Sequence, residues 1–291
     1  MAKTREIKKR IKAVGNIKRI TRTMQMIATA KFSAAQQAAV AGRPYADSIF
    51  GLVAELAAAG VDHPLLAASD SSAEQSTGNE LTLVLTSDRG LCGPYNGSVL
   101  RTAMKHIRDH GLADEGRTEL VGKKGVAFLK FNKVPVTTHH TQFGDKPAYE
   151  DVERLAQSYI DGFVSGELSK VSVIYMKYIS AGKQVPEVMQ LLPFPRPEGE
   201  ADESATLDYE FSPSAPELLG QLVPAAVKAT LFQCFSDAVV SEHVARMVAM
   251  KAATDNAGKM SKDLTRVFNR ARQAQITTEL TEIISGAAAL E

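Results

Sequence analysis

The sequence contains few of the residues that define several protein classes. It has no tryptophan, 6% aromatic residues and two cysteines, Cys92 and Cys234, among 291 residues. Two cysteines cannot form the disulfide framework of a small secreted domain, and they suit a reducing compartment. The start of the chain is charged and no apolar segment follows it, which argues against a signal peptide. No uninterrupted apolar run reaches about 18 residues, so we expect no membrane-spanning helix.

Proline is nearly absent from both ends of the chain. Residues 242–290 contain none, and residues 3–59 contain only Pro44. Toward the C-terminus, apolar residues recur at intervals of three and four, as in a helix. They are Val244, Met247, Val248, Leu264, Val267, Phe268, Ala271, Leu280, Ile283 and Ile284. About 45 helical residues would span roughly 70 Å, so this helix needs another long helix or a surrounding partner to bury its apolar stripe.

The N-terminal segment supplies a second long helix. It carries two apolar stripes that are rotated from each other, Ile7–Ile11–Val14 and Ile17–Ile20–Met24–Ile27. Two stripes imply two contact surfaces, one for a partner helix and one for another molecule. Both terminal segments are rich in alanine, which lets two helix axes approach closely. We therefore predict an antiparallel pair of terminal helices, with the rest of the chain inserted between them. A helical bundle with an alanine-rich core is the alternative.

Charge is unevenly distributed, although the net charge is only +1. The first 31 residues hold ten Lys or Arg and one acid, whereas residues 195–217 hold seven acids and one base. Such asymmetry indicates an electrostatic partner for the N-terminal helix. Clustered Lys and Arg are sufficient to contact nucleic-acid phosphates. However, no aromatic residue that could stack on bases occurs before Phe32. An acidic protein surface fits this helix as well as nucleic acid does.

The middle of the chain has the pattern of a small α/β domain. Strands are predicted at residues 81–87, 119–122, 134–140, 170–179 and 185–193, and helices at 94–110, 126–131 and 149–164. Strands that alternate with helices predict a Rossmann-like layer domain. Pro224 is expected near the start of the returning helix, because proline inside a helix kinks it. The predicted order is an N-terminal helix (1–59), a linker (60–80), an α/β domain (81–194), an acidic loop (195–216) and a C-terminal helix (217–291).

The turn after the first predicted strand is the natural place for a ligand in an α/β domain. Its sequence, SDRGLCGPYNG, spans Ser87 to Gly97. It lacks both the G-x-G-x-x-G spacing of dinucleotide sites and the G-K-[ST] ending of a P-loop. Cys92 lies near a predicted helix N-terminus, but no nearby base could activate it as a nucleophile. We expect a tight strand-to-helix turn, with neither a cofactor nor a catalytic residue.

Histidine pairs offer no convincing metal site. His106 and His110 have the helical spacing of a metal-binding pair, but the segment lacks the Glu of H-E-x-x-H. We expect two solvated surface histidines there. His139 and His140 are adjacent on a predicted strand and should point to opposite faces. The sequence therefore predicts no bound metal.

Three segments resemble the γ subunit of F-type ATP synthases, the central rotor shaft. They are IKKRIKAVGNIKRITRTMQMIATAKF near the N-terminus, LTSDRGLCGPYNG in the middle, and SEHVARMVAMKAATDNAGKMSKDLTRVFNRARQAQITTELTEIISGAAAL near the C-terminus. They occur in the family's order, and the resemblance covers essentially the whole chain. The chain is similar to bacterial-type members, because Cys92 and Cys234 do not match the dithiol insertion of chloroplast members.

The resemblance implies a non-catalytic rotor. The terminal helices would form an antiparallel coiled coil inside the ring of α and β subunits. The α/β domain would form a foot beside the ε subunit and the c-ring. Nucleotide sites would lie on the β subunits, so this chain would need no cofactor, small-molecule substrate or nucleic acid. Ion flow through the c-ring would be coupled to ATP synthesis or hydrolysis, at the cytoplasmic face of a bacterial inner membrane.

The resemblance also assigns roles to individual residues. Met24, Arg272, Gln273 and Thr277 would make the coupling contacts to a β subunit. Ile283, Ile284 and Leu290 would form a shaft tip in an apolar sleeve, and Tyr209 and Phe211 would contact the c-ring. An acid that is usual just beyond this segment is Ser212 here, so that particular contact differs from the family pattern. A nucleic-acid-binding coiled-coil protein and a small α/β enzyme with helical extensions are the other readings of the residues.

Overall fold

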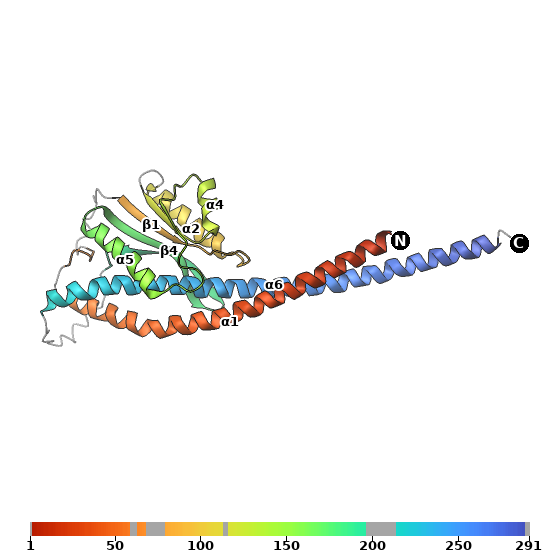
Figure 1. Cartoon of the computed structure of the whole chain (residues 1–291), viewed down its shortest axis with the longest axis horizontal. Coiled ribbons are helices and arrows are strands. Elements are labelled where there is room, and N and C mark those ends of the chain that lie inside the picture. Colours follow the sequence, from red (N-terminus) through yellow and green to blue (C-terminus); the bar gives the residue numbers. More distant parts are fainter. Residues whose placement is uncertain (1, 59–62, 68–78, 113–115, 196–213, 289–291) are drawn as a thin grey trace. The chain divides into compact units, whose positions relative to one another are not determined.

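The computed structural model describes residues 2–58, 63–67, 79–112, 116–195 and 214–288 (Figure 1). Its helices are α1 (Ala2–Ala58), α2 (Tyr95–Asp109), α4 (Lys124–Phe131), α5 (Tyr149–Val164) and α6 (Ala215–Ala288). Its strands are β1 (Asn79–Leu85), β2 (Arg117–Val121), β3 (Thr138–His140), β4 (Leu168–Ser180) and β5 (Lys183–Leu192). The chain divides into two compact units. One combines Met1–Ala30 with Arg246–Glu291, and the other is Lys31–Ala245. Helices α1 and α6 each continue from one unit into the other.

The first unit is a pair of antiparallel helices. The Thr4 hydroxyl donates to the side-chain oxygen of Gln275 at 3.1 Å, and the hydroxyl oxygens of Thr21 and Thr254 lie 2.8 Å apart. As residue numbers rise on α1 they fall on α6, which defines the antiparallel direction. Small side chains, including buried Ala28 and Ala257, line this contact. The predicted antiparallel helix pair with an inserted α/β domain is therefore confirmed.

The second unit is built on a five-stranded sheet with the order β3-β2-β1-β4-β5. The first four strands are parallel, and β5 pairs antiparallel with β4. No helix separates β4 from β5, so these two strands form a hairpin around Ala181 and Gly182. Parallel strands normally need helices on both faces of the sheet. The alternating side chains of β1 meet this need, because Leu81, Leu83 and Leu85 face one core and Val84 faces the other.

Each face of the sheet has its own apolar core. The first core gathers side chains of α5, of β1, β4 and β5, and of those parts of α1 and α6 that belong to this unit. The second core lies between the sheet and helices α2 and α4. The terminal helices therefore have two roles. Beyond the α/β unit they pair with each other, and within it they cover one face of a sheet.

Two local expectations are wrong. Helix α6 begins at Ala215, so Pro224 lies inside the helix and not near its start. Pro224 cannot donate to the carbonyl of Gly220, but Gly220 is exposed and water can satisfy that carbonyl. The third strand is shorter than residues 134–140. The amide of Val134 instead donates to the Leu129 carbonyl at the end of α4, and Pro135 has no amide hydrogen to pair.

One stretch of α6 is long and apolar enough to cross a membrane, as judged by length and composition alone. A helix that lies in a protein core passes the same test, and 44% of the most apolar window is buried inside this protein. The burial follows from the first core, to which α6 contributes side chains from Leu219 to Ala238.

We predict that Phe235→Ala destabilises the α/β unit by about 3–5 kcal/mol. Phe235 is 3% exposed, and its ring centroid lies 4.7 Å from that of Phe143. Removing it leaves a cavity between α6 and the loop that carries Phe143. Urea unfolding of the full chain measures the loss. Phe131→Ala is the matched control, because Phe131 is 86% exposed and its removal should change stability by less than about 0.5 kcal/mol. Equal effects of the two changes would contradict this assignment.

Candidate functional site

The turn between β1 and α2 is held together by its own side chains. The backbone amide of Ser87 donates to the side-chain oxygen of Asn96 at 3.0 Å, and the amide group of Asn96 donates to the Ser87 hydroxyl at 2.7 Å. Cys92 is buried within this arrangement, 3.3 Å from the same Asn96 nitrogen. Leu91 and Gly93 both have positive φ, which gives the turn its tight path. These side chains hydrogen-bond to one another and to the backbone, which is an arrangement that shapes a turn.

The expectation of two solvated histidines on α2 is wrong for one of them. His106 is buried, whereas His110 is exposed, and their ring centroids are 4.3 Å apart. Burial, together with the neighbouring His110 and Lys170 and against an opposing effect of Asp109, lowers the pKa of His106 to about 4. The Lys170 ammonium group would also repel a metal cation at this ring. Among the residues that the structure describes, no group of three or more His, Cys, Asp or Glu side chains could hold a metal ion.

A buried polar network joins β2, β3 and α5. One carboxylate oxygen of Glu119 lies 2.8 Å from His140 Nε2 and accepts a 2.7 Å hydrogen bond from the Tyr159 hydroxyl. Burial alone would raise the pKa of Glu119, but the hydrogen bonds from His140 and Tyr159, aided by the charge of Arg117, lower it overall. Burial and the adjacent carboxylate raise the pKa of the Tyr159 hydroxyl. The network fixes the short edge strand β3 against its neighbours. His139, the adjacent residue, lies 3.2 Å from the Gly122 carbonyl.

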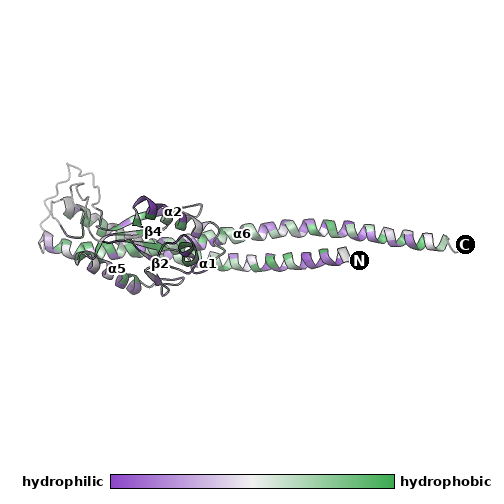
Figure 2. Ribbon diagram, turned by 90° about the horizontal axis from the view of Figure 1, so that it is seen from above, coloured by the Kyte–Doolittle hydropathy of each residue, from purple (hydrophilic) through white to green (hydrophobic). Residues whose placement is uncertain are grey.

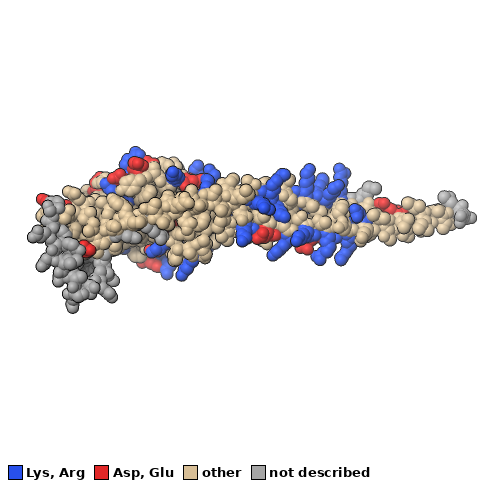
Figure 3. All heavy atoms as spheres, turned by 90° about the horizontal axis from the view of Figure 1, so that it is seen from below, with Lys and Arg blue, Asp and Glu red and all other residues tan. Residues whose placement is uncertain are grey.

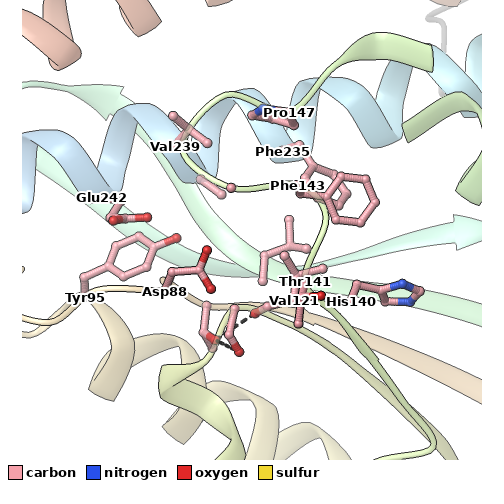
Figure 4. A pocket seen from close by; sticks show the side chains of 15 residues that line it. Asp88, Tyr95, Val121, His140, Thr141, Phe143, Pro147, Phe235, Val239 and Glu242 are labelled. Carbon is pink, nitrogen blue, oxygen red and sulfur yellow. Dashed lines mark hydrogen bonds between the residues drawn. The ribbon is translucent and has the colours of Figure 1, made fainter. Parts of the chain in front are cut away.

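A small pocket opens at the carboxyl end of the sheet (Figure 4). Its walls come from the ends of β1, β2 and β3, from the loop before α5, and from α6. Figure 4 shows Phe143 and Phe235 beside each other on one side, while Asp88, Tyr95 and Glu242 form a polar group on the other. Asp88 accepts from the backbone amide of Lys123 at 3.2 Å, which links two turns of the sheet edge. This bond indicates a structural role for Asp88.

The C-terminal turns of α6 present an uncovered apolar surface. Thr4 pairs with Gln275, so little of α1 remains to cover the residues beyond that point. Leu280, Ile283 and Ile284 are 55%, 69% and 60% exposed. Figure 2 shows hydrophobic and hydrophilic residues mixed around this part of the helix up to the C-terminus. Apolar residues exposed at helical spacing are the mark of a surface that another chain covers.

Positive charge gathers on one stretch of the two helices of the first unit, and the last turns of α6 lack it (Figure 3). The exposed bases of this surface are Arg5, Lys8, Lys9, Arg10, Lys12, Lys18, Arg19, Arg22, Lys251, Lys259, Lys262, Arg266, Arg270 and Arg272. Two of them form ion pairs within their own helix, Arg10 with Glu6 at 2.6 Å and Arg266 with Asp263 at 3.2 Å. The surface as a whole remains strongly cationic, which suits an acidic partner.

The predicted coupling residues form two separate groups. Gln273 and Thr277 are exposed on one face of α6, where the Thr277 hydroxyl donates to the Gln273 carbonyl at 3.0 Å. Arg272 is exposed on the adjoining face, in a shallow groove with Arg5 and Lys8 of α1. Met24 is half-buried on α1, about 20 residues, or roughly 30 Å, along the helix pair from this group. Tyr209, Phe211, Ser212 and Leu290 lie outside the described residues.

The fold and these surfaces together define a class of protein. Its polar side chains at the carboxyl edge of the sheet bind one another, its cysteines are both buried, and its two-helix unit exposes cationic and apolar surface. These are the features of a shaft protein, whose paired helices offer exposed surface to other chains.

Comparisons with known proteins show the family to which the chain belongs. A family model described as ATP synthase matches residues 3–290. The ATP synthase γ chain of Rhodopirellula baltica is 43% identical over 302 residues, and that of Methylibium petroleiphilum is 39% identical over 294 residues; each alignment covers all of both chains. The chain therefore belongs to the ATP synthase γ chain family. As such it is a central-stalk subunit that carries no catalytic site.

Solved structures agree on the fold. A chain of the Euglena gracilis mitochondrial ATP synthase, from a structure of OSCP, F1 and the c-ring, has a TM-score of 0.64 and 17% identity. The match covers 99% of this chain and 95% of that one. A chain from the central stalk and c-ring of the Tetrahymena thermophila enzyme has a TM-score of 0.57 and 19% identity, covering 80% of this chain and 99% of that one.

Sequence reasoning missed the polar contacts that join distant segments. Glu119 and Tyr159 are 40 residues apart, and Lys31 and Asp145 are 114 apart, so no spacing rule connects either pair. The one available signal was a run of polar residues, Ser241 to His243, between apolar residues of α6. All three are buried, and Ser241 donates to the Met176 carbonyl at 3.1 Å.

We predict that Glu119 contributes stability that is lost in acid. Its pKa in the folded protein lies below the ordinary value of 4.5. The contribution is therefore complete above pH 4.5 and disappears as the pH falls through the lower, folded-state pKa. Glu119→Gln should be clearly less stable than the unmodified chain at pH 6, and the gap should shrink at about pH 3.5. Urea unfolding at the two pH values measures the gap; a gap of constant size would show that the Glu119 charge contributes nothing.

Proposed function

We propose that this chain is the rotating shaft that couples ion flow through a membrane c-ring to ATP synthesis or hydrolysis on β subunits. In this proposal the two-helix unit turns inside a ring of alternating α and β subunits. The α/β unit is the foot, beside an ε subunit and the c-ring, at the cytoplasmic face of a bacterial inner membrane. The observation that carries the proposal is the surface of the first unit, whose cations and uncovered apolar residues need surrounding chains.

The mechanism requires asymmetry in the shaft and no chemistry from it. A ring with three-fold symmetry around two unequal helices gives each β subunit a different neighbour. Rotation then changes which β conformation has the lower free energy, because each conformation makes different contacts with the shaft. Exposed ion pairs contribute only ~0–1 kcal/mol each, so cationic contacts can break and re-form as the shaft turns.

The apolar end of α6 suits a bearing. Leu280, Ile283 and Ile284 carry no hydrogen-bonding groups in their side chains, so an apolar sleeve around them has no directional bonds to break during rotation. Leu290 would extend this tip, and Tyr209 with Phe211 would reach the c-ring from the foot. The direct test is reconstitution with α and β subunits. Co-elution with the ring, and rotation of a probe on the α/β unit when ATP is added, are expected. Absence of any association would refute the proposal.

We predict that Arg272→Ala with Gln273→Ala slows ATP synthesis and hydrolysis but leaves assembly intact. Both side chains are exposed, and neither packs in the described contact between α1 and α6. In the complex they would bind a β loop in a partly dehydrated sleeve, where hydrogen bonds to charged groups contribute roughly 1.5–3 kcal/mol. Turnover of the reconstituted complex is measured, with assembly checked by gel filtration. Arg266→Ala is the control, because Arg266 already pairs with Asp263. Normal turnover of a fully assembled double variant would remove these residues from the coupling contacts.

We predict that Met24→Lys lowers the number of ions pumped per ATP hydrolysed more than it lowers assembly. Met24 is a half-buried apolar residue in a helix whose exposed face is strongly cationic. A new ammonium group there could pair with an acidic β segment and favour one rotary position over the others. Met24→Leu keeps the site apolar and should leave coupling unchanged. Proton pumping and ATP hydrolysis by membrane-reconstituted complexes give the ratio, and a ratio equal to that of the unmodified complex would exclude this role.

A further inference from the structure

The loop between β3 and α5, residues 141–148, holds a carboxylate at the point where the helix pair enters the α/β unit. The loop is fixed by Phe143, which is buried and packs on Phe235 of α6 (Figure 4). Gly144 follows with φ +53, a conformation that L side chains rarely adopt, and the turn it makes precedes Asp145. The anchored backbone of this loop therefore holds Asp145 in a defined position.

Two cationic side chains, from α1 and from the β1–α2 turn, lie close to the Asp145 carboxylate, and His243 of α6 adds to their electrostatic effect. Lys31 Nζ of α1 lies 2.5 Å from Asp145 Oδ2, and the guanidinium of Arg89, in the β1–α2 turn, lies 4.0 Å from the same oxygen. The hydrogen bond from Lys31 outweighs partial burial and lowers the pKa of Asp145, with additional effects of Arg89 and of His243 on α6. One carboxylate thus joins α1 to the turn that follows the central strand, and it does so within the electrostatic reach of His243 on α6.

The position of this cluster along the helices is informative. Lys31 is the first residue of α1 that belongs to the α/β unit, and Ala245 is the last such residue of α6, two positions beyond His243. Contacts with β4 lie on the same stretches of the helices. Tyr178 faces Phe32 with ring centroids 6.1 Å apart, and its hydroxyl accepts from Gln36 at 3.3 Å. On α6, the Ser241 hydroxyl donates to β4.

We propose that Asp145 is the central residue of a group of contacts that transmits torque between the α/β unit and both shaft helices. We call this group the collar; it consists of the contacts of Asp145 and the contacts of Phe32, Gln36 and Ser241 with β4. This rests on the proposed rotor function. If the α/β unit is turned by one partner and the helices work against another, twisting is resisted where the helices leave the unit. The apolar core beneath resists separation, but apolar contact is non-directional and resists sliding weakly. An ion pair between a fixed loop and a helix opposes rotation of that helix. The collar contacts therefore set the torsional stiffness of the rotor, and Asp145 acts as a positioning residue.

The test measures stiffness in the assembled complex. The α and β ring is immobilised, a probe is attached to the α/β unit, and thermal fluctuation of the probe angle is recorded in the stalled complex. Asp145→Lys replaces the attractions to Lys31 and Arg89 with repulsions. We expect it to raise the angular variance about 1.5-fold or more, because local contacts that hold an element determine how freely it moves. The double change Asp145→Lys with Lys31→Asp re-forms the central pair and should return the variance most of the way.

The matched control is Asp151→Lys, which breaks an ion pair with Arg154 that lies entirely within α5. It should leave the variance unchanged. An Asp145→Lys complex that assembles and fluctuates like the unmodified one would overturn the collar, as would a double variant as loose as the single one. If Asp145→Lys fails to fold, Asp145→Asn gives the same comparison with a smaller expected change. Failure of the unmodified chain to assemble or rotate would instead count against the rotor function itself.

Discussion

The apolar face of an amphipathic helix must be buried, and α6 is too long for a single domain core to bury all of it. This requirement shapes the whole chain. Over Arg246–Gln275, α6 obtains part of that cover from α1, through small residues and the Thr21–Thr254 contact. Within the α/β unit, both helices obtain it from the sheet, in a core that also holds α5. Beyond Gln275 little of α1 remains, and Leu280, Ile283 and Ile284 stay exposed. Each stretch of this continuous helix thus has a different neighbour, and the last stretch has almost no neighbour within the chain.

The contrast between the two units follows from the same constraint. Around Glu119 and Ser87 the α/β unit pairs its buried polar groups with one another, so its sheet edge is shaped by structural hydrogen bonds. The two-helix unit carries its cations on the outside and pairs some of them only within a helix. The first arrangement holds the elements of the α/β unit in fixed positions through hydrogen bonds that do not involve solvent. The second gives a surface whose favoured neighbours change easily, which is what a moving contact needs.

Much of this fold follows from the sequence because its signals are local. The period of apolar residues predicts both long helices, and α5 occupies Tyr149–Val164 as expected from its pattern. The errors arise where a distant segment or solvent changes the local preference. Pro224 is tolerated inside α6 because the Gly220 carbonyl is exposed, and His106 is buried because α2 packs on the sheet. The coupling residues came from family resemblance alone, because an exposed Gln or Thr has no pattern of its own. The Lys31–Asp145 pair has no local signal at all, since 114 residues separate its members.

The antiparallel arrangement also has a consequence for how the chain is made. Thr4 and Thr21 leave the ribosome first, whereas their partners Gln275 and Thr254 are more than 200 residues later in the chain. At translation rates of about 5–20 residues per second, the part of α6 that pairs with the N-terminal helix is made on the order of tens of seconds after it. Its basic composition keeps it soluble and self-repelling during that interval, when an apolar helix of the same length would aggregate. The charge that suits the finished surface therefore also protects the unfinished chain.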